Sequence, residues 1–152
     1  MNLRKSEPSE LDVIYNMGFD VWNGGLSLEE YLTGCRNSDK YRAGTWYVLI
    51  ENGQIVSSLI VYSGLFGLKE GCYGIGSVAT PLSLRGKGYA SQLIRLVTAE
   101  LFARSGIKAV YLHSDIGHEF YRKLGFATIA KTDCMLNSKD TSLLEEPIPE
   151  YF

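Results

Sequence analysis

Residues 77–90 read Ser77-Val-Ala-Thr-Pro-Leu-Ser-Leu-Arg85-Gly-Lys-Gly-Tyr-Ala90, and this stretch decides the fold. Its pattern predicts an apolar strand, a short loop and the opening of a long helix. Two glycines and two basic residues fall at the head of the helix, where the first backbone N–H groups have no partner within the helix. Glycine lets a ligand come close to the backbone, and the positive end of the helix dipole attracts phosphate oxygens. The stretch therefore predicts an anion-binding turn for a pyrophosphate, with Arg85 and Lys87 adding charge.

Three other interpretations of the glycines in and before this turn need to be weighed. Arg85-Gly-Lys-Gly88 also fits a solvated basic turn that merely caps a helix. A P-loop is excluded, because the turn lacks the Gly-Lys-Ser/Thr that would reach magnesium and the outer phosphates. The pattern Gly74-x-Gly76-x-x-Ala79 matches a dinucleotide-binding fingerprint by letter, but it lies inside an apolar stretch instead of opening a helix.

Length and composition limit the class of protein. The 152 residues predict one domain spanning residues 1–152. Apolar content of 45% and charged content of 21% are ordinary for a soluble globular protein. No apolar run approaches the roughly 20 residues of a membrane span, and the first residues lack the apolar core of a signal peptide. We therefore expect a cytoplasmic protein without a membrane partner. The net charge of −2 argues against nucleic-acid binding.

The cysteines give no sign of a disulfide framework or a metal site. Cys35, Cys72 and Cys134 are widely separated, no Cys-x-x-Cys occurs, and the chain has two histidines. An odd number of scattered cysteines predicts buried or neutral thiols. We accordingly expect no bound metal.

Local patterns predict a mixed order of helices and strands. The expected elements are a strand at 3–6, a helix over 9–22 with Trp22 toward the core, a helix opened by the Ser27–Glu30 capping box, strands at 45–50 and 55–62 joined by Asn52-Gly53, a strand at 72–79, a helix over 86–104, a strand at 107–112, a short helix capped by Ser114 or Asp115 that ends at Gly125, and a strand at 126–134. Gly74 and Gly76 indicate a bulge or a close ligand approach within their strand.

Two blocks resemble a known family. Arg85-x-x-Gly88-x-Ala90 resembles the Arg/Gln-x-x-Gly-x-Gly/Ala signature of the GNAT N-acetyltransferases, and Val78-Ala-Thr-Pro81 resembles the fourth strand of that family. A second block, His113–Phe126, looks like the family's closing Phe-Tyr-x-x-x-Gly-Phe element. The resemblance extends from near Met1 to about Cys134 and leaves 136–152 as a C-terminal extension outside the matched motifs. It implies a mixed α/β (α+β) fold with a central, mostly antiparallel sheet that is splayed around the CoA arm and flanked by helices.

The resemblance also implies a coenzyme and its binding residues. The co-substrate would be acetyl-CoA, with no metal. The implied contacts to it are Val78, Ala79, Thr80, Arg85, Gly86, Lys87, Gly88, Tyr89, Ala90 and Ser91. The backbone N–H of Val78 would stabilise the oxyanion of the tetrahedral intermediate.

The resemblance supplies a candidate for the general acid but none that matches the family's base. Tyr121 resembles the tyrosine that serves many members as general acid, although a half-buried structural aromatic would look the same. Some members carry a glutamate base on the fourth strand, whereas this strand offers Cys72 and Tyr73 and no carboxylate. His113, Asp115 and Glu119 remain as alternative bases, while Asp115 also fits an N-cap and His113 an exposed ring.

The resemblance predicts an enzyme, an N-acetyltransferase acting on a primary amine of a small molecule or peptide by direct attack in a ternary complex. The alternative is a non-catalytic acyl-CoA-binding or sensing domain of the same fold, and a nucleotide-phosphate module comes third. The two blocks are similar to those of, among others, fungal enzymes that acetylate free lysine. A monomer and a homodimer both fit the sequence.

Overall fold

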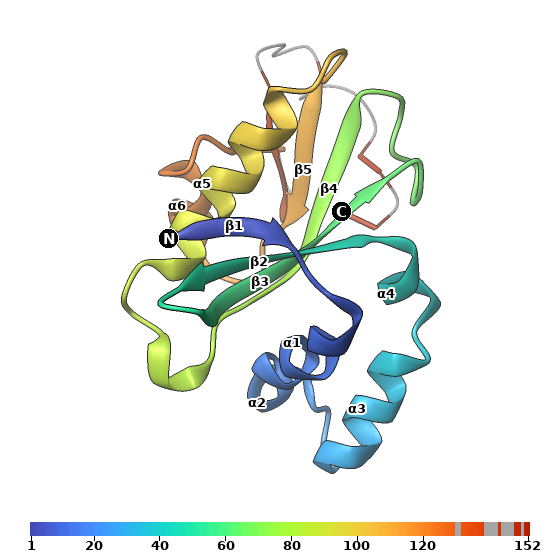
Figure 1. Ribbon diagram of the computed structural model, residues 1–152. Coiled ribbons are helices and arrows are strands. Elements are labelled where there is room, and N and C mark those ends of the chain that lie inside the picture. The colour runs from blue at the N-terminus through green and yellow to red at the C-terminus, as the bar shows by residue number, and fades with distance from the viewer. Residues whose placement is uncertain (130–131, 139–142, 144–147, 150) are drawn as a thin grey trace. The chain divides into compact units, whose positions relative to one another are not determined.

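The computed structural model describes residues 1–129, 132–138, 143, 148–149 and 151–152. The chain divides into two compact units, residues 1–60 with 77–93 and residues 61–76 with 94–152. Seven strands are hydrogen-bonded in the order β1-β2-β3-β4-β5-β7-β6 (Figure 1). Helices interrupt the strands along the chain, so the predicted mixed α/β class with a mostly antiparallel sheet is confirmed. The expectation of one domain over 1–152 stays a prediction.

Eight elements lie entirely within the described residues of the first unit. They are β1 (Asn2–Lys5), η1 (Pro8–Glu10), α1 (Leu11–Met17), α2 (Phe19–Trp22), α3 (Leu28–Arg36), α4 (Asp39–Ala43), β2 (Thr45–Glu51) and η2 (Leu82–Leu84). Strand β1 pairs antiparallel with β2, from Asn2 opposite Ile50 to Lys5 opposite Tyr47. Three further elements pass along the chain from one unit into the other, namely β3 (Gln54–Ser63), β4 (Cys72–Ala79) and α5 (Tyr89–Phe102).

The turn and cap signals of this region are confirmed. Asn52 and Gly53 have φ of 51° and 75° between β2 and β3, as a tight hairpin turn requires. Ser27 accepts from the Glu30 backbone N–H, and the Glu30 side chain accepts from the Ser27 N–H, which completes the capping box at the start of α3. Both signals act between residues close in sequence, so the sequence specifies them directly.

The predicted single helix over 9–22 is wrong, because the chain forms η1, α1 and α2 with a break at Gly18. A Cβ atom on Gly18 would lie 2.1 Å from a ring carbon of Trp22, so glycine leaves room for that ring. Trp22 therefore covers the helix break and is 36% exposed, not directed into the core as expected.

Helix α5 begins three residues later than predicted. Gly86 and Gly88 have φ of 81° and 83°, which no right-handed helix contains, and the Gly88 carbonyl accepts the helical bond from Gln92. In the sequence, Ala90, Leu93, Ile94, Val97 and Leu101 recur at helical spacing and predict one apolar face. This face is confirmed, since Leu93, Ile94, Val97 and Leu101 are completely buried and Ala90 is half-buried.

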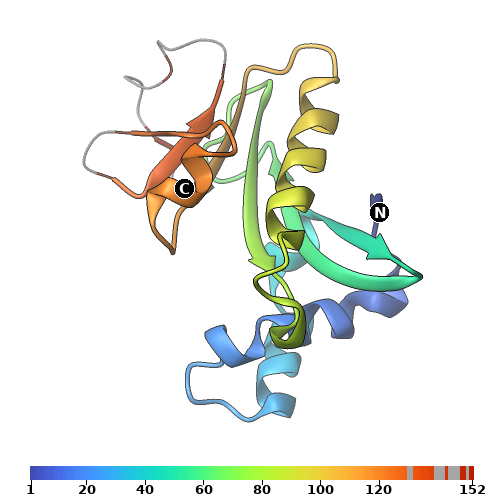
Figure 2. The same ribbon diagram turned by 90° about the vertical axis from the view of Figure 1, so that its left-hand side faces the viewer.

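The second unit contains β5 (Ala109–His113), α6 (His118–Arg122), β6 (Ala127–Thr128) and β7 (Cys134–Asn137). Residues Cys72–Ile75 of β4 pair in parallel with Ala109–Leu112 of β5, and the second half of α5 runs beside this pair (Figure 1, Figure 2). Strand β7 pairs antiparallel with both β5 and β6. The predicted splay of β4 stays a prediction.

Two expectations for this region are wrong. The strand over 126–134 is instead the hairpin β6–β7, closed where Thr132 N–H donates to the Ile129 carbonyl and Ile129 N–H to the Cys134 carbonyl. Helix α6 starts after Gly117, with no capping bond from Ser114 or Asp115. Residues 130–131 of the predicted strand, and 139–142, 144–147 and 150 of the C-terminal extension, lie outside the described residues.

Candidate functional site

The glycine turn, residues 85–88, is exposed and lies between η2 and α5. Gly86 and Gly88 both adopt left-handed φ, and a Cβ atom on either would meet nothing within 4 Å. The backbone here is therefore reachable by a ligand, while its conformation strains any other residue. Just beyond it, the first N–H groups of α5 have no partner within the helix and lie at its positive end. Geometry and dipole together suit an anion, and the binding of one at this turn stays a prediction.

The two basic residues of the turn differ in their surroundings. Lys87 is exposed. The Arg85 guanidinium instead donates to both carboxylate oxygens of Asp20 on α2, and to the carbonyls of Thr80 and Met17. Arg85 was expected to supply charge to the ligand, but its donors are engaged by the protein.

Tyr89, Ala90 and Ser91 form the first turn of α5 and are partly buried. The Tyr89 hydroxyl donates to the carboxylate of Glu51 at the end of β2. That hydrogen bond raises the pKa of Tyr89. The start of α5 is therefore fixed to β2 through Tyr89, the residue that directly follows the glycine turn.

Val78, Ala79 and Thr80 lead from β4 into the turn. The Ser57 hydroxyl donates to the Ala79 carbonyl at 2.9 Å and lies 3.0 Å from the Thr80 hydroxyl, which anchors the end of β4 to β3 within the first unit. Val78 is half-buried.

A backbone irregularity precedes Val78. Ser77 has φ of 48°, a left-handed conformation that is uncommon for a residue other than glycine. Its hydroxyl donates to the Tyr41 hydroxyl of α4 at 3.2 Å. Gly74 and Gly76 predicted a bulge in this strand, and the irregularity falls on the next residue.

Gly74 makes room for an aromatic side chain. A Cβ atom on Gly74 would lie 2.1 Å from the Phe152 ring, so this ring, and not a ligand, makes the close approach that glycine permits there. Phe152 is 4% exposed and belongs to an aromatic cluster with Tyr62, Phe66 and Tyr151. The only signal for this in the sequence was the pair of aromatic residues after a proline-containing segment.

Tyr121 lies on α6 in the second unit and is 7% exposed. Its ring packs against the edges of Phe120 and Phe126, with centroids 5.0 and 6.3 Å away. Burial raises the pKa of Tyr121 to about 12, and the negative charge of Asp115 adds to the rise. The phenol is therefore fully protonated at neutral pH and chemically suited to donate a proton.

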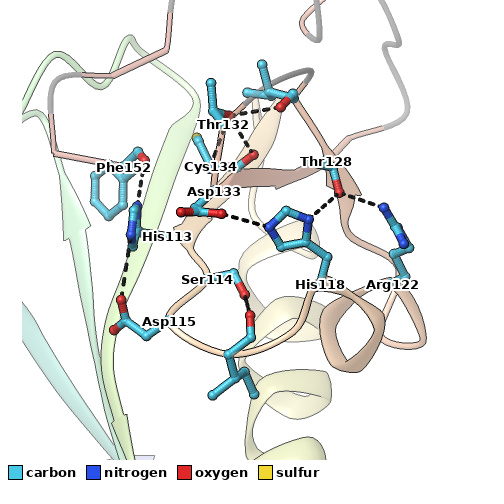
Figure 3. A network of polar contacts seen from close by, with 12 residues as sticks. His113, Ser114, Asp115, His118, Arg122, Thr128, Thr132, Asp133, Cys134 and Phe152 are labelled. Carbon is cyan, nitrogen blue, oxygen red and sulfur yellow. Dashed lines mark hydrogen bonds and ion pairs between the residues drawn. The ribbon is translucent and has the colours of Figure 1, made fainter.

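The three candidate bases, His113, Asp115 and Glu119, are more exposed than Tyr121. His113 ends β5, where its Nδ1 lies 3.3 Å from the Phe152 carbonyl and its Nε2 lies 3.6 Å from an Asp115 oxygen (Figure 3). Glu119 on α6 forms a 3.6 Å ion pair with Arg122, and its side chain is 70% exposed. Surface pairs of this kind hold a side chain only weakly.

A second histidine network carries no signal in the sequence pattern. His118 Nε2 lies 3.0 Å from Asp133, and its Nδ1 lies 3.4 Å from the Thr128 hydroxyl, which also accepts from Arg122 (Figure 3). Asp133 is 15 residues further along the chain, so only the β6–β7 hairpin brings it to α6. The contacts hold that hairpin to the helix.

Cys35, Cys72 and Cys134 are buried thiols, as predicted. Within the described part of the chain, no group of three or more His, Cys, Asp or Glu residues could hold a metal ion. Nor does any helix among the described residues have the length and apolar character needed to cross a membrane.

The sequence matches the model of the acetyltransferase (GNAT) family over residues 12–126. A lysine acetyltransferase of Yarrowia lipolytica is 28% identical over 88% of this chain. The chain spans 42% of the length of that relative.

Solved structures show the same fold. A GNAT family acetyltransferase from Brucella melitensis, in complex with acetyl-CoA, has a TM-score of 0.66 at 22% identity, over 91% of this chain and 88% of that one. An aminoglycoside acetyltransferase in complex with coenzyme A and kanamycin has a TM-score of 0.67 at 19% identity, over 91% and 94% of the two chains.

Proposed function

Because the chain belongs to the GNAT acetyltransferase family, we propose that it transfers an acetyl group from acetyl-CoA to a primary amine of a small molecule or peptide. The observation that carries this proposal is the glycine turn. Its two left-handed glycines leave the backbone open at the positive end of α5, which suits the pyrophosphate of a coenzyme.

Each predicted coenzyme contact has a role in this proposal. The backbone of Gly86–Gly88 and the N–H groups of Tyr89, Ala90 and Ser91 bind the phosphates, and Lys87 supplies the positive charge. Val78, Ala79 and Thr80 line the acyl arm, with the Val78 N–H donating to the oxyanion. Arg85 contributes its backbone, since its side chain is bonded to Asp20.

The reaction removes two protons from the ammonium form of the amine and supplies one proton to the thiolate. An amine with a pKa near 10.4 is almost entirely protonated at pH 7, so freeing its lone pair costs about 4 to 5 kcal/mol. The free amine attacks the thioester carbonyl and the new C–N bond forms. The nitrogen then loses its second proton, and the C–S bond breaks as the tetrahedral intermediate collapses. Tyr121 then protonates the departing thiolate, a role that its protonated state at neutral pH allows. His113 and Glu119 are the candidate bases, with a water chain as the alternative.

The acceptor is a primary amine, and free lysine is the first candidate because the Yarrowia lipolytica relative is a lysine acetyltransferase. The chain would act in the cytoplasm as a monomer or homodimer. A second function needs a test, because β4 from Cys72 to Ala79 carries no carboxylate base. A non-catalytic acyl-CoA-binding domain would need the glycine turn but no proton donor.

One experiment separates these functions. The protein is incubated with acetyl-CoA and a panel of lysine, other amino acids, polyamines, aminoglycosides and peptide N-termini, and free thiol and acetylated amine are both measured. We expect equal amounts of thiol and product with at least one amine, and a higher melting temperature with CoA. Stabilisation by CoA without any product would indicate the binding domain. A melting curve that CoA leaves unchanged would contradict both functions.

A further inference from the structure

The Arg85 side chain ties the segment before the glycine turn to α1 and α2 within the first unit. Its Nη1 and Nη2 donate to the two Asp20 carboxylate oxygens at 2.7 and 2.8 Å. Its Nε donates to the Thr80 carbonyl at 2.9 Å, and Nη2 also lies 3.4 Å from the Met17 carbonyl. A bidentate arginine–carboxylate pair fixes orientation as well as distance. All three guanidinium nitrogens are therefore bonded to the protein.

We propose that Asp20 is a positioning residue for the coenzyme. Through Arg85, it holds the backbone of Gly86–Gly88 in the conformation that receives the pyrophosphate. This inference rests on the proposed function, because it takes the glycine turn to be the coenzyme site. Asp20 itself would not touch the coenzyme.

Apolar packing does little to fix this part of the chain. A cavity of about 290 Å³ lies between α1–α2 and the residues that precede the turn, and its lining includes Met17, Phe19, Pro81 and Leu82. Leu82 is 70% exposed, so it buries little surface against those helices. Across this loosely packed region the Arg85–Asp20 pair supplies directional contacts.

The glycine turn is a place where such support matters. Gly86 and Gly88 have open space around them, and glycine has the widest choice of backbone conformations. A turn that samples many conformations must lose that freedom when a ligand binds, which lowers affinity. Holding Arg85 at one end, while Tyr89 is held by Glu51 at the other, limits that loss.

A simpler role for Asp20 predicts the opposite effect. If Asp20 only neutralised Arg85, its removal would free a positive charge beside the phosphates, and CoA would bind more tightly. If Asp20 positions the turn, its removal lets Arg85 and the turn move, and CoA binds more weakly. The sign of the change in CoA affinity therefore decides between the two roles.

The test measures the dissociation constant of CoA by calorimetry, together with the melting temperature, for Asp20→Asn. We expect the dissociation constant to rise roughly tenfold while the melting temperature falls only slightly, because a partly exposed ion pair contributes little to stability. In turnover assays, the KM for acetyl-CoA should rise more than kcat falls. Asp20→Glu keeps the carboxylate and should recover part of the affinity.

Asp12→Asn is a matched control. Asp12 on α1 forms the same two-point contact with Arg36 on α3, at 3.0 and 2.8 Å, in the same unit. It does not touch the segment from Thr80 to Gly88. Its loss should change the melting temperature about as much as Asp20→Asn, while the CoA dissociation constant stays within about twofold of the parent.

Arg85→Gln completes a cycle with Asp20→Asn. If both residues act as one unit, the CoA dissociation constant of the double variant should not exceed that of the single variant that binds CoA more weakly. A dissociation constant for Asp20→Asn that equals or falls below that of the parent, while the parent binds CoA, would overturn the positioning role alone. Failure of the parent to bind CoA would overturn the proposed function, and this inference with it.

Discussion

The glycine turn and helix α6 carry the two halves of the proposed chemistry, and different forces hold them in place. The turn is held by directional polar contacts, from Arg85 to Asp20 and from Tyr89 to Glu51. Tyr121 on α6 is held by burial among aromatic rings. A phosphate site needs backbone donors at fixed positions in contact with water, whereas a proton donor benefits from a dry environment that keeps it protonated.

The comparison also separates Tyr121 from the candidate bases near it in sequence. Burial holds Tyr121 and raises its pKa to about 12. His113 and Glu119 are more exposed, and their contacts with Asp115 and Arg122 are 3.6 Å long in both cases. His113 Nδ1 also lies 3.3 Å from the Phe152 carbonyl. We therefore expect substitutions in the glycine turn and at Tyr121 to have large and distinct effects, and substitutions of the two bases to have smaller ones.

The largest effect is expected for Gly88→Asp. The side chain would place a negative charge where the phosphates bind, so CoA affinity should fall on the order of 100-fold or more, and the rise in melting temperature with CoA should disappear. The backbone at φ of 83° adds strain of about 1 kcal/mol to any such variant. Calorimetry and thermal melting check both parts.

Gly53→Asp provides the control, because Gly53 is also left-handed, with φ of 75° and no atom near its Cβ position. It lies in the β2–β3 turn and has no predicted ligand role. It should lose similar stability yet retain the response to CoA. Equal CoA binding by Gly88→Asp and the parent would show that the glycine turn is not the coenzyme site.

Tyr121→Phe should affect turnover and not binding. The phenyl ring preserves the contacts with Phe120 and Phe126, while loss of the proton donor should lower kcat by roughly ten- to a thousandfold. The CoA dissociation constant should stay unchanged. Single-turnover acetylation and calorimetry measure the two quantities separately.

Tyr47→Phe removes the hydroxyl of another buried tyrosine, on β2, and should leave kcat at the parent value. If Tyr121→Phe turns over as fast as the parent while the chemical step limits the rate, Tyr121 is only a structural aromatic. That result would also favour the alternative function, a non-catalytic acyl-CoA-binding domain.

The smallest effects of substitution are expected at the candidate bases, which a pH–rate profile tests. With water as the base, kcat/KM should rise about tenfold per pH unit up to the pKa of the amine, because only the free amine attacks. The acid must stay protonated, and the pKa of Tyr121 is raised to about 12, so no fall in rate due to Tyr121 should appear below about pH 10. A pH–rate profile from about pH 6 to 10 checks this.

His113→Ala and Glu119→Gln sharpen that experiment. With a water base, both variants should keep kcat/KM within about threefold of the parent, since their side chains are exposed and loosely paired. A bend near about pH 6.5 to 7 that His113→Ala removes would identify His113 as the base. A profile altered only by Glu119→Gln would assign the role to Glu119.

Sequence reasoning succeeded where the deciding contacts are local. The capping box at Ser27, the Asn52-Gly53 hairpin, the apolar face of α5 and the glycine turn all depend on residues within a few positions of one another. It failed at the break in the helix over 9–22, because Gly18 and Trp22 fit a helical pattern equally well whether the ring points inward or back over the glycine. It failed again at 126–134, where a hairpin bonded between residues 129 and 134 was taken for one strand.

The family, most of the order of elements and the place of the glycine turn can be read from the amino-acid sequence, because periodicity, capping and the demand for left-handed φ are short-range properties. What the side chains at the site do depends on the folded chain. Arg85 finds its carboxylate 65 residues away at Asp20, and Gly74 is adjacent to Phe152. The environment of Tyr121 is likewise set by packing, which raises its pKa. Long side chains and buried acids respond to whatever the fold brings beside them, and no local pattern encodes those partners.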